Sequence, residues 1–181
     1  LGNLQVGTDL ASAAAGSDFI IEAVPEKLDL KREIFASLEA NAPDHAVLAS
    51  NTSTIPITQI ADGVKQPERV IGMHFFNPVR QMSLVEVICG PDTSDSTVAS
   101  VVLHAKRLKK VPVVVQDSPG FLVNRVLTPY LHESVELLRE GVDPSRIDKV
   151  SRRFGMPLGP LELYDMVGLD TAFYAGLVMA N

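Results

Sequence analysis

The sequence predicts an α/β domain that is followed by an all-helical domain. In the first part of the chain, short apolar runs alternate with segments of helical spacing, which is the pattern of βα units. A polar turn follows several of these runs, as expected where the strands of such a sheet end. From Asp117 onward the apolar residues keep helical spacing only. We therefore expect one domain over residues 1–116 and a second over residues 117–181.

Six short apolar segments of the first domain are predicted as strands. The strongest, Asp18–Val24, is nearly continuous and β-branched, as a strand buried in a parallel sheet is. In chain order they are Leu4–Val6, Asp18–Val24, Ala46–Ala49, Val70–Phe75, Leu84–Ile88 and Val111–Val115. Pro112 favours the start of its strand or an edge position, because proline cannot donate a hydrogen bond to a neighbouring strand.

Helices are predicted between these strands. Apolar residues recur on one face of a helix from about Lys27 to Asn41, and on one face of another over Asp95–Leu108. A short helix begins near Pro56, and a hydroxyl from the polar turn Ser50–Ser53 is expected to cap it.

The second domain opens with a turn in which Ser118 is a candidate N-cap and Pro119 would take the first helical position. Helical spacing follows from Phe121 to Glu140, with a kink expected at Pro129. Gly141 ends this helix.

Two shorter helices are predicted after it. Asp143 and Pro144 cap the first of them, and Leu161–Met166 begins the next. The second domain is therefore expected to be helical throughout.

Composition and charge exclude several function classes. The 181 residues are 46% hydrophobic and 21% charged, as in a globular protein, and 16 basic against 22 acidic side chains give a net charge of −6. A main function in nucleic-acid binding needs clustered positive charge and is not expected. No apolar run is long enough to span a membrane. The chain begins at Leu1 without methionine, and we expect it to be an excerpt of a longer polypeptide.

Disulfide and metal chemistry are not expected either. Cys89 is the single cysteine, so an intrachain disulfide cannot form, which fits a reducing compartment. The four histidines are far apart and lack the spacing of metal ligands; they are His45, His74, His104 and His132.

His74 and Glu86 are the strongest candidates for catalysis. A carboxylate that accepts a hydrogen bond from one imidazole nitrogen fixes the tautomer and makes the other nitrogen more basic. Such a pair can remove the proton of an alcohol while a hydride leaves the same carbon. The two strands that carry these residues are joined by the loop Asn77–Ser83, which could bring the side chains within hydrogen-bond reach. The alternative is a hydrogen-bonded core histidine beside an outward-facing glutamate.

Three other polar segments have both a functional and a purely structural interpretation. A hydroxyl of Ser50–Ser53 that does not cap the helix could bond a substrate oxygen. Asn124 could be a positioned amide donor or an exposed helical residue. The charges of Glu26–Arg32 fit a solvated helix face with i, i+4 pairs, or Lys31 could meet a phosphate or ribose.

Together these segments resemble the L-3-hydroxyacyl-CoA dehydrogenase family, in particular the dehydrogenase part of bacterial multifunctional fatty-acid oxidation proteins. The matching segments are ordered along nearly the whole chain, and their combination is specific although each alone is weak. They are Ile21–Glu26, Ala49–Pro56, Gly72–Val79, Leu84–Ile88, Asp117–Arg125 and Gly155–Asp170. The sequence contains no G-x-G-x-x-G, and the family's first strand, glycine-rich turn and ribose-binding acid have no counterpart. The resemblance therefore implies a truncated Rossmann-like NAD-binding domain before the helical domain.

The resemblance also implies roles for individual residues. His74 would be the general base, Glu86 would orient and polarise it, and Ser53 and Asn124 would bond the substrate oxygen atoms. The positions that match the cofactor and CoA site are Glu26, Lys31 and Asn77.

The implied reaction is the NAD-dependent oxidation of (3S)-3-hydroxyacyl-CoA to 3-ketoacyl-CoA in fatty-acid β-oxidation. The implied partners are an acyl-CoA substrate and either a second copy or a fatty-acid oxidation complex, in the bacterial cytoplasm. Two alternatives stay open: a short-chain 3-hydroxybutyryl-CoA or sugar-acid dehydrogenase, and a non-catalytic, crystallin-like relative. The missing glycine turn leaves open whether the chain alone binds NAD or is active.

Overall fold

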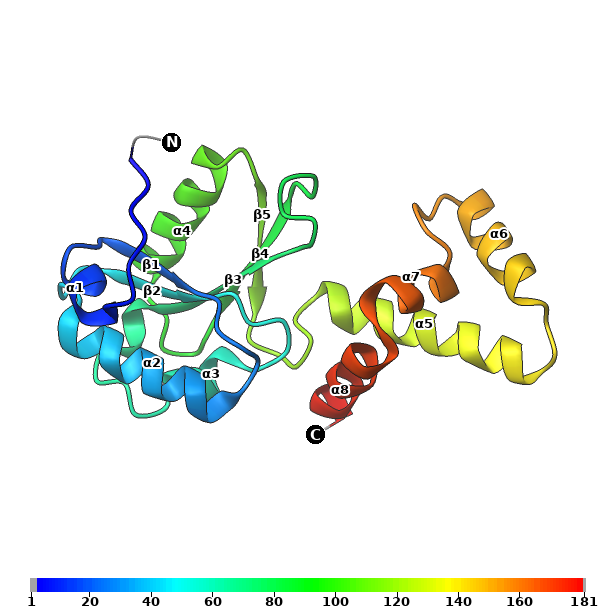
Figure 1. Ribbon diagram of the computed structural model, residues 1–181, viewed down its shortest axis with the longest axis horizontal. Coiled ribbons are helices and arrows are strands. Elements are labelled where there is room, and N and C mark those ends of the chain that lie inside the picture. Colours follow the sequence, from blue (N-terminus) through cyan, green and yellow to red (C-terminus); the bar gives the residue numbers. More distant parts are fainter. Residues whose placement is uncertain (1–2, 181) are drawn as a thin grey trace. The chain divides into compact units, whose positions relative to one another are not determined.

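The computed structural model describes residues 3–180 of the chain. Contacts between residues divide the chain into two compact units, Leu1–Phe121 and Leu122–Asn181 (Figure 1). The first unit is an α/β domain and the second is helical, so the predicted fold class is confirmed.

A five-stranded mixed sheet forms the centre of the first unit. Its strands, in spatial order, are β1 (Phe19–Glu22), β2 (Val47–Ser50), β3 (Val70–Phe75), β4 (Leu84–Cys89) and β5 (Val111–Gln116). Neighbouring strands are parallel except β3 and β4, which are antiparallel. The carboxyl ends of β1, β2 and β3 therefore lie at one edge of the sheet, where ligands of open α/β sheets bind. Pro112 lies in the edge strand β5, as its chemistry requires.

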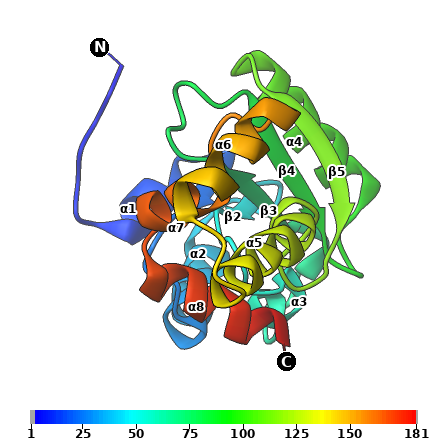
Figure 2. The same cartoon turned by 90° about the vertical axis from the view of Figure 1, so that its right-hand side faces the viewer.

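Helices cover both faces of this sheet. They are α1 (Leu10–Ala15), α2 (Leu28–Asn41), α3 (Ile57–Ala61), the 3₁₀ turn η1 (Pro67–Arg69) and α4 (Asp95–Arg107). Figure 1 shows α2 and α3 on one face and α4 on the other, and Figure 2 shows α4 beside β4 and β5.

The strand side chains alternate between two apolar cores. Leu48, Val70 and Ile88 pack with Phe35 of α2 and Ile57 of α3. The side chains of the opposite face, such as Ile71, Met73 and Val87, pack with Val101 and Ala105 of α4. Burial on both faces explains why these strands read as continuous apolar runs in the sequence.

The prediction of a strand at Leu4–Val6 is wrong. Leu4 is 72% exposed and Val6 is 92% exposed, and this segment pairs with no strand among residues 3–180. Apolar side chains alone do not make a strand when no partner supplies backbone hydrogen bonds. The short helix α1, which follows, has no counterpart among the predicted elements.

The prediction that a hydroxyl of Ser50–Ser53 caps α3 is also wrong. Asp117, which directly follows β5, accepts hydrogen bonds from the backbone N–H groups of Ile57 at 2.8 Å and Thr58 at 2.7 Å. Thr52 instead closes the preceding turn, since its Oγ1 accepts a hydrogen bond from the N–H of Ile55 at 3.0 Å. A carboxylate favours the positive end of a helix, and here it comes from a distant part of the chain.

The second unit consists of α5 (Val123–Arg139), α6 (Pro144–Phe154), α7 (Pro160–Val167) and α8 (Leu169–Ala180). Asp143 caps α6 with its carboxylate on the N–H of Arg146, as predicted, and Gly141 has φ +89° just after α5. No helix within residues 3–180 is both long and apolar enough to cross a membrane.

The predicted start of α5 is wrong. Neither Ser118 nor Pro119 begins the helix, because Gly120 at φ 73° and Phe121 at φ 50° are left-handed and interrupt helical geometry. The helix begins at Val123, two residues after Phe121, where the predicted helical spacing starts. Pro129 lies inside α5, as its sequence position indicated.

Candidate active site

His74 and Glu86 form a buried hydrogen-bonded pair. The antiparallel register of β3 and β4 places these residues opposite each other, so both side chains lie on the same face of the sheet. Nδ1 of His74 lies 2.8 Å from Oε2 of Glu86. His74 is 5% exposed and Glu86 is 0% exposed. The predicted contact is confirmed, and the alternative of an outward-facing glutamate is excluded.

Aromatic rings surround the imidazole of His74. The ring centroid of Phe76 lies 4.5 Å from that of His74, and the centroid of Phe121 lies 5.9 Å from it. Such apolar neighbours exclude water and lower the local dielectric constant, which strengthens the hydrogen bond to Glu86. Because Nδ1 is the nitrogen that bonds Glu86, Nε2 is the nitrogen that can take a proton from a substrate.

The polar turn after β2 is fixed by a single carboxylate oxygen. Oε1 of Glu26 accepts hydrogen bonds from Oγ1 of Thr52 at 2.6 Å, the N–H of Ser53 at 2.9 Å and the N–H of Thr54 at 3.1 Å. The side chain of Ser53 is exposed while its backbone is held. Burial by itself would raise the pKa of Glu26, but the hydrogen bonds and the charge of Lys31 outweigh burial and hold the pKa below its usual value.

This pKa has a consequence for stability. A carboxylate whose pKa is lower in the folded state stabilises the fold above its unfolded pKa, and loses this contribution as the pH falls through the folded pKa. In urea unfolding at a series of pH values, Glu26→Gln should therefore flatten the loss of stability below roughly pH 4. Glu33→Gln removes an exposed carboxylate of α2 and is the matched control. Equal slopes for wild type and Glu26→Gln would contradict the expectation.

Lys31 is buried rather than solvated. Its side chain is 1% exposed, and Nζ lies 2.9 Å from Oε1 of Glu22 and 3.3 Å from Oε2 of Glu26. The interpretation of this segment as a solvated helix face is therefore wrong for Lys31. Arg32, the next residue, does form a surface ion pair, but with Asp62 at the end of α3, at 2.8 Å, rather than with a residue four positions away on its own helix.

The remaining predicted site residues lie in two different places. Asn77 is exposed and lies two residues after β3, at the same sheet edge as His74 and Ser53. Asn124 is half-buried and is the second residue of α5, in the second unit. The roles of both residues stay predictions.

Two structural partners of the site were missed in the sequence. Asn51 joins the ends of β2 and β3, since its Oδ1 accepts a hydrogen bond from the N–H of Phe75 at 2.9 Å. Glu22 at the end of β1 is 4% exposed and bonds Lys31 and Ser50. A glutamate that ends an apolar strand was the available signal for Glu22.

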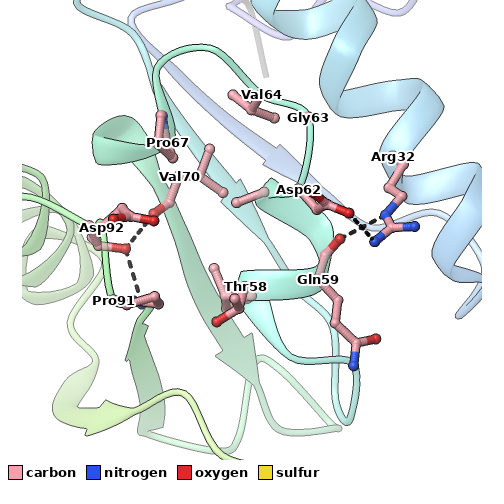
Figure 3. Close-up of a pocket in the computed structure, with 14 residues that line it drawn as sticks. Arg32, Thr58, Gln59, Asp62, Gly63, Val64, Pro67, Val70, Pro91 and Asp92 are labelled. Atoms are coloured by element: carbon pink, nitrogen blue, oxygen red, sulfur yellow. Dashed lines mark hydrogen bonds and ion pairs between the residues drawn. The ribbon is translucent and has the colours of Figure 1, made fainter.

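A hollow of about 410 Å³ lies at the opposite end of β3, beside α3 and the turn Gly90–Thr93. Figure 3 shows Arg32 at its rim, turned towards Asp62 and Gln59. No predicted site residue lines it. Within residues 3–180, no three His, Cys, Asp or Glu side chains are grouped as metal ligands.

Two family models cover this architecture. The model described as 3-hydroxyacyl-CoA dehydrogenase, NAD binding domain, matches residues 1–118. The model described as 3-hydroxyacyl-CoA dehydrogenase, C-terminal domain, matches residues 120–181. The chain belongs to the 3-hydroxyacyl-CoA dehydrogenase family. The predicted family is thereby confirmed.

Relatives within the 3-hydroxyacyl-CoA dehydrogenase family include a protein of Acinetobacter baylyi named fatty acid oxidation complex subunit alpha. It is 51% identical over 164 residues, which are 91% of this chain and 23% of that protein. The chain thus spans about a quarter of the length of this relative.

Solved structures of the family agree with the fold. The (S)-3-hydroxybutyryl-CoA dehydrogenase of Ralstonia eutropha has a TM-score of 0.91 at 42% identity, over 96% of this chain and 62% of that one. The 3-hydroxybutyryl-CoA dehydrogenase of Escherichia coli has the same TM-score of 0.91 at 42% identity, over 96% of this chain and 37% of that one.

Proposed function

We propose that the protein containing this chain oxidises (3S)-3-hydroxyacyl-CoA to 3-ketoacyl-CoA with NAD, a step of fatty-acid β-oxidation. The observation that carries the proposal is the buried hydrogen bond between His74 and Glu86 in a dehydrogenase fold. The name of the Acinetobacter relative supports the pathway.

The residues divide the reaction between them. His74 takes the proton of the 3-hydroxyl on Nε2, while the hydride leaves the same carbon, so that a ketone forms. Glu86 holds the imidazole in the required tautomer and stabilises its positive charge after proton transfer. Ser53 and Asn124 are proposed to donate hydrogen bonds to substrate oxygen atoms, where negative charge develops as the proton leaves.

NAD, when bound, supplies the hydride acceptor. The carboxyl ends of β1, β2 and β3 fit such a cofactor, because Glu26, Ser53 and Asn77 follow these strands at one edge of the sheet. We propose that Glu26 and Asn77 contact the cofactor, and that Lys31, which is 1% exposed, supports the cofactor and acyl-CoA site through its ion pair with Glu26. Glu26 is the member of the Lys31 ion-pair network that a ligand can reach, since its side chain is 29% exposed.

The partners and the location of the full-length protein are proposals as well. We propose that the full-length protein works in a fatty-acid oxidation complex or as a homodimer, in the bacterial cytoplasm. The complex is supported by the name of the Acinetobacter relative.

A short-chain 3-hydroxybutyryl-CoA dehydrogenase is the second candidate. Two solved structures at 42% identity carry that activity in their names. The same four residues would act, so the preferred acyl length decides between the two candidates.

The test is the formation of NADH by the full-length protein, followed by absorbance, with (3S)-3-hydroxyacyl-CoA substrates of short and long chains. We expect turnover of the (3S) isomers and none of the matched (3R) isomers. Turnover restricted to the shortest substrate would favour the second candidate. Absence of NADH with every (3S) substrate would refute both and would favour a non-catalytic relative.

A further inference from the structure

Glu22 is a buried carboxylate without a role in the reaction as proposed above. It ends β1 and is 4% exposed. Its Oε2 accepts a hydrogen bond from Oγ of Ser50 at 2.7 Å, and its Oε1 accepts one from the N–H of Val24. Both oxygens also contact Nζ of Lys31, at 2.9 and 3.0 Å. A charge that is buried with so many donors is held in one position.

Lys31 uses its whole donor capacity inside this network. An ammonium group has three hydrogens. Nζ of Lys31 contacts Glu22, Oε2 of Glu26 at 3.3 Å and the backbone oxygen of Val24 at 3.4 Å. A ligand could recruit Lys31 only if one of these contacts broke. Lys31 therefore connects two carboxylates, of which Glu22 is buried and Glu26 is partly exposed.

Glu26 connects Lys31 to the turn that contains Ser53. The oxygen that faces Lys31 is Oε2, and the oxygen that accepts bonds from Thr52, Ser53 and Thr54 is Oε1. The carboxylate is thus fixed on one side by a buried cation and fixes the turn with its other side. If Glu26 rotated, the N–H of Ser53 would lose its acceptor.

We propose that Glu22 is a positioning residue for Ser53, acting through Lys31 and Glu26. This inference rests on the proposed function, in which Ser53 bonds a substrate oxygen. Loss of the Glu22 charge leaves Glu26 as the one carboxylate paired with Lys31. In Glu22→Gln, the side-chain NH₂ would also face donors such as Nζ of Lys31 and Oγ of Ser50. The turn then loses its fixed geometry, and misplacement of a substrate-binding group is costly for turnover.

A double-mutant cycle on the full-length protein tests the proposal. We expect Glu22→Gln and Ser53→Ala each to lower kcat about tenfold, and the double variant to lower it about tenfold as well, because both remove the same contribution. Arg32 lies on α2, as Lys31 does, and pairs with Asp62 at the end of α3. Arg32→Met, which breaks this surface pair, is the matched control and should leave kcat within roughly twofold of wild type. If Glu22→Gln does not fold, Ser50→Ala takes its place in the cycle with Ser53→Ala, because it removes a hydrogen bond to Glu22 and keeps all charges.

Backbone exchange separates this proposal from the function itself. Hydrogen exchange of the Ser53 and Thr54 amides should become faster in Glu22→Gln, whether or not the protein turns over a substrate. If the wild type is active and the double variant loses kcat roughly a hundredfold, the effects of the two substitutions are independent. This result would overturn the positioning role. Unchanged amide exchange in Glu22→Gln would overturn it too. A wild type without turnover would instead refute the proposed function, and the exchange result would still decide whether Glu22 holds the turn.

Discussion

His74→Gln in the full-length protein should lower kcat by about a hundredfold to ten-thousandfold, the usual cost of removing a general base. Glutamine can keep a hydrogen bond to Glu86, whose carboxylate is 0% exposed, but cannot take the substrate proton. Glu86→Gln should also reduce kcat, because an amide that donates to Nδ1 forces the proton onto Nε2 and blocks its action as a base. Steady-state rates of NADH formation measure both losses, and circular dichroism checks that the fold is kept.

The chain contains a matched control for this experiment. Nε2 of His45 lies 2.8 Å from Oδ1 of Asp18, the same separation as in the His74 pair, but His45 is 70% exposed and Asp18 is 87% exposed. His45→Gln should leave kcat unchanged, since an exposed pair outside the site has no part in proton transfer. Rates for His74→Gln that match those of His45→Gln would end the assignment of His74 as the base.

The contact of His74 with Glu86 could be predicted because it depends on short-range information. Both strands are mostly apolar, and the short connection between them favours an antiparallel pair. Glu86 interrupts its apolar run, and a buried carboxylate needs a partner. The sequence therefore contained both the geometry and the reason for the pair.

Contacts between distant segments could not be predicted in this way. Asp117 caps α3 although 60 positions separate it from Ile57. The hydroxyls of Ser50–Ser53 are nearer to α3 in the sequence, and only the fold of the sheet places the end of β5 beside α3. In the same way, the charge pattern around Lys31 is that of an exposed helix, and its burial depends on Glu22 and Glu26 from outside the helix.

Backbone conformation explains the error at the start of α5. Ser118 and Pro119 carry an ordinary helix-start signal, but Gly120 and Phe121 adopt left-handed φ angles of 73° and 50°. A phenylalanine in this region is costly by roughly 1–2 kcal/mol, so packing must hold it there. Phe121 is 3% exposed and packs in the apolar core, close to His74. Tertiary burial thus outweighs the local capping signal.

Gly159→Ala should destabilise the helical unit by about 1–3 kcal/mol, the usual cost of overpacking. A Cβ at this position would lie 2.2 Å from Oδ1 and 2.3 Å from Cβ of Asp148. Asp148 is 8% exposed and its Oδ1 accepts a hydrogen bond from the N–H of Leu161 at 2.9 Å, so its displacement would also break a contact that fixes the start of α7. Hydrogen exchange of the peptides that cover residues 144–167 measures the loss. Gly176→Ala is the matched control, because among the described residues no atom outside the adjoining backbone of α8 lies within 4 Å of its added Cβ, and alanine is the better helix former in α8. Equal protection of α6 and α7 in both variants would show that Asp148 can move away without cost.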